Sequence, residues 1–151
     1  MIIGIARSDG GLSVMTLVDG LGLEDVPREV AKLEAAGVLT AVRWQELFAY
    51  PPRLFRDAYE LGDGVCVCNM QKARRLRVDA IRAARTPVFV TLDHDWMRAV
   101  GQKLPAQADA IEAKRQALRD LPQTYAAQIG DAKTPEELAA VKPAELEPAP
   151  S

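Results

Sequence analysis

The sequence has one histidine, two cysteines and few aromatic residues, which make up 5% of its 151 residues. A single histidine leaves no conventional histidine-based catalytic triad unless His94 belongs to it. Two cysteines do not form the disulfide framework of a small secreted domain. The shortage of large aromatic side chains leaves few anchors for a deep ligand pocket. We therefore expect no catalytic residues, no bound metal and no cofactor.

Long apolar runs and an excess of charge of one sign are also missing. No stretch approaches the roughly 20 apolar residues that a membrane-spanning helix needs, and the N-terminus lacks the basic and apolar regions of a secretory signal. We expect neither a leader nor a membrane partner. The net charge of −2 argues against a general nucleic-acid binder. A composition of 48% hydrophobic and 26% charged residues is typical of a soluble globular protein and excludes full disorder.

The first part of the chain predicts a small α+β domain over residues 1–68. Apolar strands at 2–6 and 12–18 flank the turn residues 8–11, which indicates a β-hairpin with a four-residue loop. Asp25 is a candidate helix cap and Pro27 suits the first turn. Gly37 is in the position expected after the last turn. Further strands at 38–44 and 65–68, with a helical turn near 54–59, complete an antiparallel sheet with one or two helices.

Residues 69–143 predict a helical hairpin region. Asn69 is a candidate cap for a helix that Pro87 kinks or breaks. Helical spacing favours a helix over a strand for 88–100, and a second helix is expected over 105–121. A capping box from Thr134 to Glu137 predicts a short last helix that ends near 141, and residues 144–151 predict a flexible tail. The apolar stripe expected on the first helix consists of Ala73, Leu76, Ala80, Ile81 and Ala84.

No motif in the sequence nominates a reaction centre. Asp93-His94-Asp95 is the one place where a histidine meets carboxylates, but neighbours on a helix point in different directions and cannot converge on one ion. Gly20-Leu21-Gly22 lacks the further residues of a nucleotide-binding loop and predicts a turn. Cys66 and Cys68 lie on the same side of the expected strand. We favour reduced core cysteines over metal ligands or disulfides between chains.

Charge is distributed unevenly along the chain. Residues 1–68 contain six basic and ten acidic residues, whereas residues 72–85 contain six basic residues and one acidic residue. The predicted helix therefore has an arginine-rich side, formed by Arg74, Arg75, Arg82 and Arg85, opposite its apolar stripe. Three interpretations remain open for this side: a solvated helix face, pairing with acidic protein surfaces, and contact with nucleic-acid phosphates. No aromatic residue is interleaved to stack bases, so nucleic acid is the least favoured of the three.

The second half of the chain resembles a known group of proteins. The resemblance rests on Phe55-Arg56-Asp57-Ala58, Lys72-Ala73-Arg74, the stretch from Arg82 to Asp93, Met97-Arg98-Ala99, the block from Lys114 to Asp120, Thr134-Pro135-Glu136-Glu137-Leu138 and Pro143. In this order the motifs are similar to those of small tail-associated and tail assembly chaperone-like proteins of tailed bacteriophages, over roughly residues 55–143. The Gly101-Gln102-Lys103 connection lacks the expected acidic residue. The first fifty residues do not contribute to the likeness.

The resemblance implies a non-enzymatic bacteriophage tail or tail-fibre protein. Such a protein is a structural component of the virion, or alternatively a transient assembly chaperone in the cytoplasm of the bacterial host. Its partners would be other tail or tail-fibre proteins, or further copies of this chain in an oligomer. Candidate contact residues are Trp96, Met97 and Tyr125, for which packing within the hairpin is the alternative, together with Arg74, Arg75, Arg82 and Arg85. An accessory protein that binds nucleic acid through the helix at 72–85, and a small hydrolase, remain alternatives from other classes.

Overall fold

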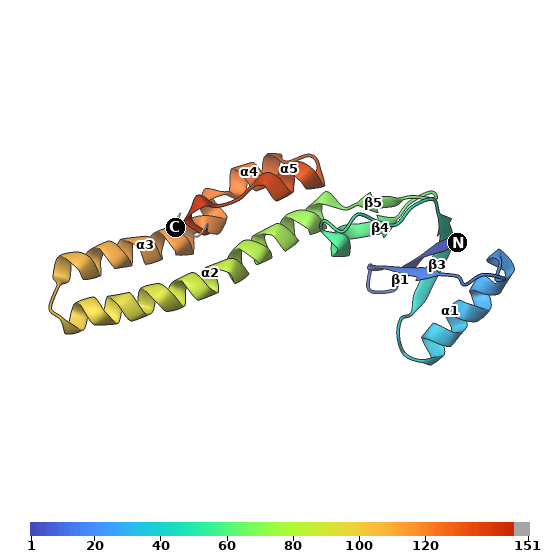
Figure 1. Cartoon of the computed structure of the whole chain (residues 1–151). Coiled ribbons are helices and arrows are strands. Elements are labelled where there is room, and N and C mark those ends of the chain that lie inside the picture. Colours follow the sequence, from blue (N-terminus) through green and yellow to red (C-terminus); the bar gives the residue numbers. More distant parts are fainter. Residues whose placement is uncertain (147–151) are drawn as a thin grey trace. The chain divides into compact units, whose positions relative to one another are not determined.

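The computed structural model describes residues 1–146, and the expected α+β fold is confirmed (Figure 1). The chain divides after Ala73 into two compact units, unit 1 (Met1–Ala73) and unit 2 (from Arg74 onward). The sequence places this boundary five residues earlier. Helix α2 (Met70–Gly101) begins in unit 1 and supplies most of its length to unit 2. No helix within residues 1–146 is long and apolar enough to span a membrane.

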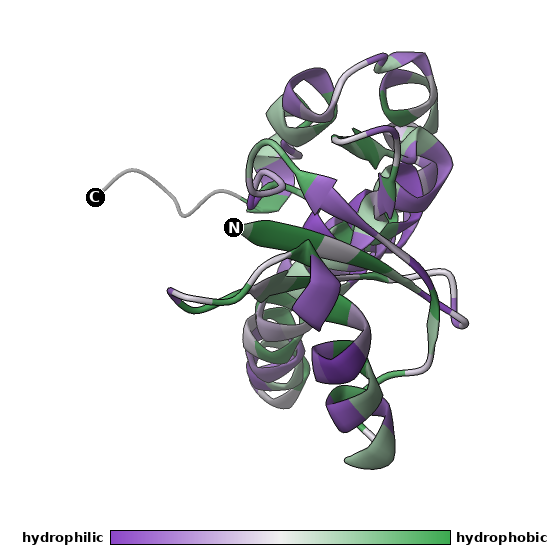
Figure 2. Ribbon diagram, turned by 90° about the vertical axis from the view of Figure 1, so that its right-hand side faces the viewer, coloured by the Kyte–Doolittle hydropathy of each residue, from purple (hydrophilic) through white to green (hydrophobic). Residues whose placement is uncertain are grey.

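Unit 1 is built around the strand β1 (Ile2–Arg7), which lies between β2 (Leu12–Thr16) and β3 (Ala41–Leu47) in an antiparallel sheet. Figure 2 shows that β1, which starts at the N-terminus, is hydrophobic along most of its length. Ile3 and Ile5 are fully buried on one face of the sheet together with Val26 and Val30. Both valines belong to α1 (Val26–Ala35), so this helix covers that face.

The second face of the sheet lies against a short hairpin of β4 (Tyr59–Leu61) and β5 (Cys66–Cys68). Gly4 of β1 permits the close approach. A Cβ atom built on Gly4 would lie 2.6 Å from Cδ1 of Leu61. The sequence did not predict β4, whose first residue, Tyr59, was assigned to the preceding helical turn. The strand expected at 38–44 begins later, at Ala41, and the helical turn expected near 54–59 is a 3-10 turn, η2 (Arg56–Ala58).

Unit 2 consists of helices, of which α2 and α3 (Pro105–Thr124) form the expected antiparallel hairpin (Figure 1). Two short helices, α4 (Ala126–Asp131) and α5 (Pro135–Ala140), follow. The largest fully buried side chains of this unit are Ile81, Leu121 and Leu138. The capping box of α5 is confirmed, since Thr134 Oγ1 accepts from the Glu137 amide at 3.1 Å.

Two parts of unit 2 differ in detail from the expectations. Pro87 lies inside α2, which continues past it as one helix of 32 residues, so the helix does not break there. Pro87 has no amide to donate to the carbonyl of Ala83, and Ala83 is exposed, so water can take the place of that donor. Residues 144–146, assigned to the flexible tail, form a 3-10 turn, η3, in which Glu145 accepts a hydrogen bond from the Tyr125 hydroxyl. Residues 147–151 of the expected tail lie outside the described part of the chain.

Candidate functional site

Three arginines of α2 point toward the rest of unit 2, although the sequence placed Arg74 and Arg85 on the side of the helix opposite its apolar stripe. Arg74 donates to the carbonyls of Ile129 at 3.2 Å and Ala132 at 2.8 Å, at the C-terminal end of α4. Arg77 donates from Nε to the carbonyl of Val141 at 3.0 Å, just after α5. The last carbonyls of a helix have no partner within the helix. The two guanidinium groups supply the missing donors.

Arg85 performs the same role inside α3. Its Nη1 donates to the carbonyls of Leu118 and Arg119, both at 2.9 Å. Pro122 lies four residues after Leu118 within α3 and has no amide hydrogen to donate to it. Arg85 therefore replaces the hydrogen bond that Pro122 removes. Together the three arginines hold α3, α4 and the end of α5 against α2.

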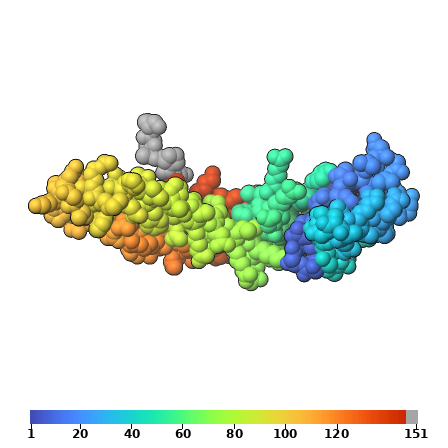
Figure 3. Space-filling view, turned by 90° about the horizontal axis from the view of Figure 1, so that it is seen from below, coloured from blue at the N-terminus to red at the C-terminus, as the bar shows by residue number. Residues whose placement is uncertain are grey.

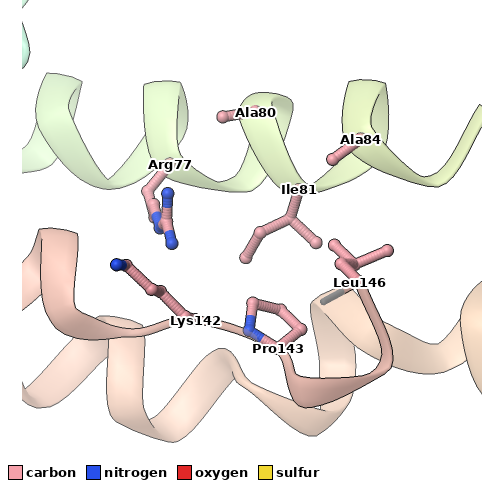
Figure 4. Close-up of a pocket in the computed structure, with 7 residues that line it drawn as sticks. All are labelled: Arg77, Ala80, Ile81, Ala84, Lys142, Pro143 and Leu146. Atoms are coloured by element: carbon pink, nitrogen blue, oxygen red, sulfur yellow. The ribbon is translucent and has the colours of Figure 1, made fainter. Parts of the chain in front are cut away.

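The expected apolar stripe of α2 also differs, because Ala80 and Ala84 are exposed. Both alanines line a shallow cavity of about 270 Å³. The other lining residues are Arg77, Ile81, Lys142, Pro143 and Leu146. Figure 4 shows Arg77 and Lys142 at one end of this cavity and apolar side chains along the rest. Its lining contains two cations and no carboxylate, so it has no acid–base pair.

The segment Asp93-His94-Asp95 does not converge on one point. Asp93 forms an ion pair with Arg115 of α3 at 2.8 Å, and Asp95 lies 3.8 Å from Arg98 in the next turn. His94 is exposed. Within residues 1–146, no three His, Cys, Asp or Glu side chains are grouped as metal ligands. Cys66 and Cys68 are half-buried thiols, and burial raises the pKa of Cys66.

The exposed part of α2 contains a row of side chains spaced by seven residues. We call Arg75, Arg82, Phe89 and Trp96 the outer row. Seven residues are almost two turns of an α-helix, so these four lie on one side of it. Arg75 and Arg82 are exposed, and Phe89 and Trp96 are half-buried. In Figure 3 one flank of α2, coloured green to yellow, is uncovered, with α3 in orange along its edge.

Further apolar side chains widen the aromatic end of the outer row. Val90 is 55% exposed, Met97 57% and Val100 49%. The apolar surface of this half of α2 is therefore not confined to the side that α3 covers. Exposed apolar surface on neighbouring turns of a helix is typical of a protein-binding site.

Arg115 pairs with acidic side chains beside this apolar surface. Its guanidinium lies 5.5 Å from the centre of the Trp96 ring, within cation–π range, and pairs with Asp93 and Glu112. Arg119, followed by Arg115, lowers the pKa of Glu112. Because Arg115 crosses from α3 to α2, it fixes the indole of Trp96 and removes an unpaired charge from the surface.

We predict that replacing Arg115 by alanine releases Trp96 and leaves Asp93 without its ion pair. The indole then becomes more exposed to water, so its fluorescence emission shifts to longer wavelength. The measurement uses a Trp44→Phe background, because Trp44 of β3 would otherwise contribute to the emission. Replacing Arg98, which is exposed and lies two residues after Trp96 on roughly the opposite side of the helix, provides the matched control. An unchanged spectrum in the Arg115 variant would contradict the cation–π arrangement.

The structure separates the residues that the sequence proposed for partner contact. Arg75, Arg82, Trp96 and Met97 remain on the exposed side of α2, whereas Arg74 and Arg85 are used within unit 2 as described above. Tyr125 lies between α3 and α4, where its hydroxyl bonds to Glu145 and accepts from the amide of Ala144. The candidate contact residues predicted from the sequence did not include Phe89. Its spacing of seven residues from both Arg82 and Trp96 could have indicated it.

Comparisons with protein-family models, curated proteins and solved structures found no match to this chain.

Proposed function

We propose that this chain is a protein-binding component of a bacteriophage tail or tail fibre that uses the outer row of α2 as its contact surface. The observation that carries the proposal is the row itself, in which two exposed arginines continue into Phe89 and Trp96. Arginine and large aromatic residues are the types that most often dominate the energy of protein interfaces. The tail setting comes from the resemblance over residues 55–143.

The chemistry of the outer row defines its partner. Arg75 and Arg82 favour a surface with carboxylates, and Phe89, Trp96 and Met97 favour apolar side chains about two turns further along. A partner helix with acidic residues toward one end and apolar residues toward the other would match this order. Arg82 already pairs with Asp79 at 3.1 Å, but its side chain remains 58% exposed, so it can exchange this partner at little cost.

Nucleic acid is a less suitable partner for the same helix. Of the six basic residues from Lys72 to Arg85, three donate to backbone carbonyls within unit 2, and Lys72 pairs with Glu60 at 2.7 Å. Binding to phosphates requires several free cations, and it weakens steeply with salt. Two exposed arginines next to an aromatic surface fit an acidic protein better.

The proposal is tested by locating the chain in purified tails and by cross-linking from the outer row. A photoreactive amino acid at position 96 should cross-link to a tail protein in infected cells, whereas the same group at Ala113, exposed on α3, should not. Arg82→Glu should abolish the cross-link from position 96. Arg98→Glu, an equal change of charge at an exposed arginine outside the row, should leave it intact.

Mass spectrometry of purified tails separates the two roles. A constant copy number relative to other tail proteins supports a structural component. Absence from the particle, with a cross-link to a tail protein during assembly, supports a transient chaperone. A chain that is absent from particles and cross-links to no tail protein overturns the proposal.

A further inference from the structure

The outer edge of β2 in unit 1 presents unpaired backbone groups. In an antiparallel pair, a residue directs both its amide and its carbonyl either to the partner strand or away from it, in alternation. Arg7 donates to the carbonyl of Gly11, and Leu17 donates to that of Met1. These two bonds fix the alternation. Ser13 and Met15 bond to β1, while Leu12, Val14 and Thr16 direct their amides and carbonyls outward.

This edge lacks the usual protection against pairing with another strand. Exposed edges in natural sheets are normally blocked by charged side chains, prolines or bulges. Residues 10–18 contain no charged residue and no proline, and the pairing of β2 with β1 is regular throughout. The opposite edge strand, β3, contains Arg43 and Glu46, and its register with β1 shifts at Ala6. The edge formed by β2 is therefore open to another strand, whereas the edge formed by β3 is protected.

A largely apolar cavity of about 400 Å³ follows the open edge. Four residues of β2 line it, from Leu12 to Met15, together with Ile5, Leu33, Val38, Leu39 and one charged residue, Arg56. Met15, Leu33 and Leu39 are among the partly buried residues that pack against the core of unit 1. The core therefore remains open toward this edge, and an added strand would close it.

We propose that a second copy of this chain closes the edge by pairing its β2 antiparallel to the first. This interface is separate from the outer row of α2 and does not depend on the proposed function. A two-fold axis at Val14 places each Val14 opposite the other, and it places Ser13 opposite Met15 of the second copy. The outward amides and carbonyls of Leu12, Val14 and Thr16 then find partners. The two three-stranded sheets become one sheet of six strands.

The sequence of β2 is complementary to itself in this register. Small Ser13 faces long, flexible Met15 on the α1 side of the sheet, once on each side of the axis, so each methionine fills space in the cavity beside the other copy's serine. The two Val14 side chains form a β-branched pair, which is favourable across strands. No like charges meet, because the strand has none.

The mass of the full chain in solution, measured by sedimentation across micromolar concentrations, tests the pairing. We expect a dimer for the natural chain. Val14→Pro removes an outward amide and no bond to β1, and edge strands tolerate proline at such positions. It should weaken the dimer by at least about tenfold. Glu46→Pro makes the corresponding change on the outer side of β3 and should leave the dimer unchanged.

Opposite charges placed at Val14 distinguish a lost dimer contact from a folding defect. Val14→Lys and Val14→Glu chains should each dimerise weakly, because two like charges then face each other. An equimolar mixture of the two should form a mixed dimer more tightly than either chain alone. A natural chain that stays monomeric overturns the inference and leaves the cavity to a segment of another protein. A dimer that Val14→Pro does not weaken, or a mixture that shows no rescue, also overturns it. None of these outcomes affects cross-linking from position 96.

Discussion

Replacing Leu138 by alanine is expected to lower the free energy of unfolding of unit 2 by about 3 kcal/mol. Leu138 is fully buried, with 0% of its surface exposed, although α5 has only six residues. The substitution removes its apolar contacts and leaves a cavity that the surrounding helices cannot fully close. Hydrogen exchange of the backbone amides measures the effect separately in each unit. Faster exchange is expected in α5 and in the neighbouring part of α2.

The same experiment tests the division of the chain after Ala73. Amides of β1 should exchange at the natural rate in the Leu138 variant, because Ile3 and Ile5 belong to a separate core. Glu136→Ala, at an exposed position of the same helix, serves as the control and should change stability by less than about 0.5 kcal/mol. Equal loss of protection in β1 and α5 would show that the chain unfolds as one unit.

Removal of the Arg85 guanidinium is expected to cost about 2 kcal/mol, since hydrogen bonds from charged donors contribute roughly 1.5–3 kcal/mol. Arg85→Ala leaves the Leu118 carbonyl without a donor, because Pro122 cannot provide one. The cost should be smaller when Pro122 is also replaced by alanine, which restores the amide of residue 122. Thermal or denaturant unfolding of the four chains in a double-mutant cycle measures this coupling.

The sign of the coupling distinguishes the proposed role from simple packing. We expect the cost of Arg85→Ala to fall by about 1 kcal/mol in the Pro122→Ala background. Arg82→Ala, which removes an exposed arginine from the same helix, should cost little in either background. Equal costs of Arg85→Ala with and without Pro122 would show that the guanidinium does not compensate for the proline.

The elements that the sequence predicted best are those whose ends have local signals. The loop at 8–11, the cap at Asn69 and the capping box at Thr134 depend on residues within a few positions of each other, and the structure confirms all three. The termination of α1 is also confirmed. Gly37 has a φ of +68°, and the amide of Val38 donates to the carbonyl of Leu33 at 2.9 Å, as expected of a glycine after the last helical turn.

The arrangement of side chains around α2 could not be predicted in the same way. Hydrophobic periodicity assigns arginine to solvent and alanine to the core, whereas Arg74 and Arg85 point inward and Ala80 and Ala84 are exposed. The positions of the carbonyls that need a donor decide this, and they depend on how α3, α4 and α5 fold back. Such contacts join residues 33 to 64 positions apart. No local pattern contains them.

The candidate site was only partly visible in the sequence for the same reason. Composition singled out Trp96, Met97 and the arginines, but a count of basic residues cannot separate those that hold the fold from those that remain exposed. The structure makes this distinction and adds Phe89. Tyr125 was chosen as a large aromatic residue, yet its hydroxyl is used in contacts with η3.

The pairing of guanidinium groups with uncharged carbonyls has a consequence for how unit 2 responds to solution conditions. A guanidinium keeps its proton in strongly alkaline solution, whereas a lysine amine loses it near pH 10. Added electrolyte weakens attraction between exposed opposite charges far more than a directed hydrogen bond to a peptide oxygen. Unit 2 should therefore keep its helices together at high salt concentration and at high pH. Lysine would not be an equivalent replacement at position 74, 77 or 85.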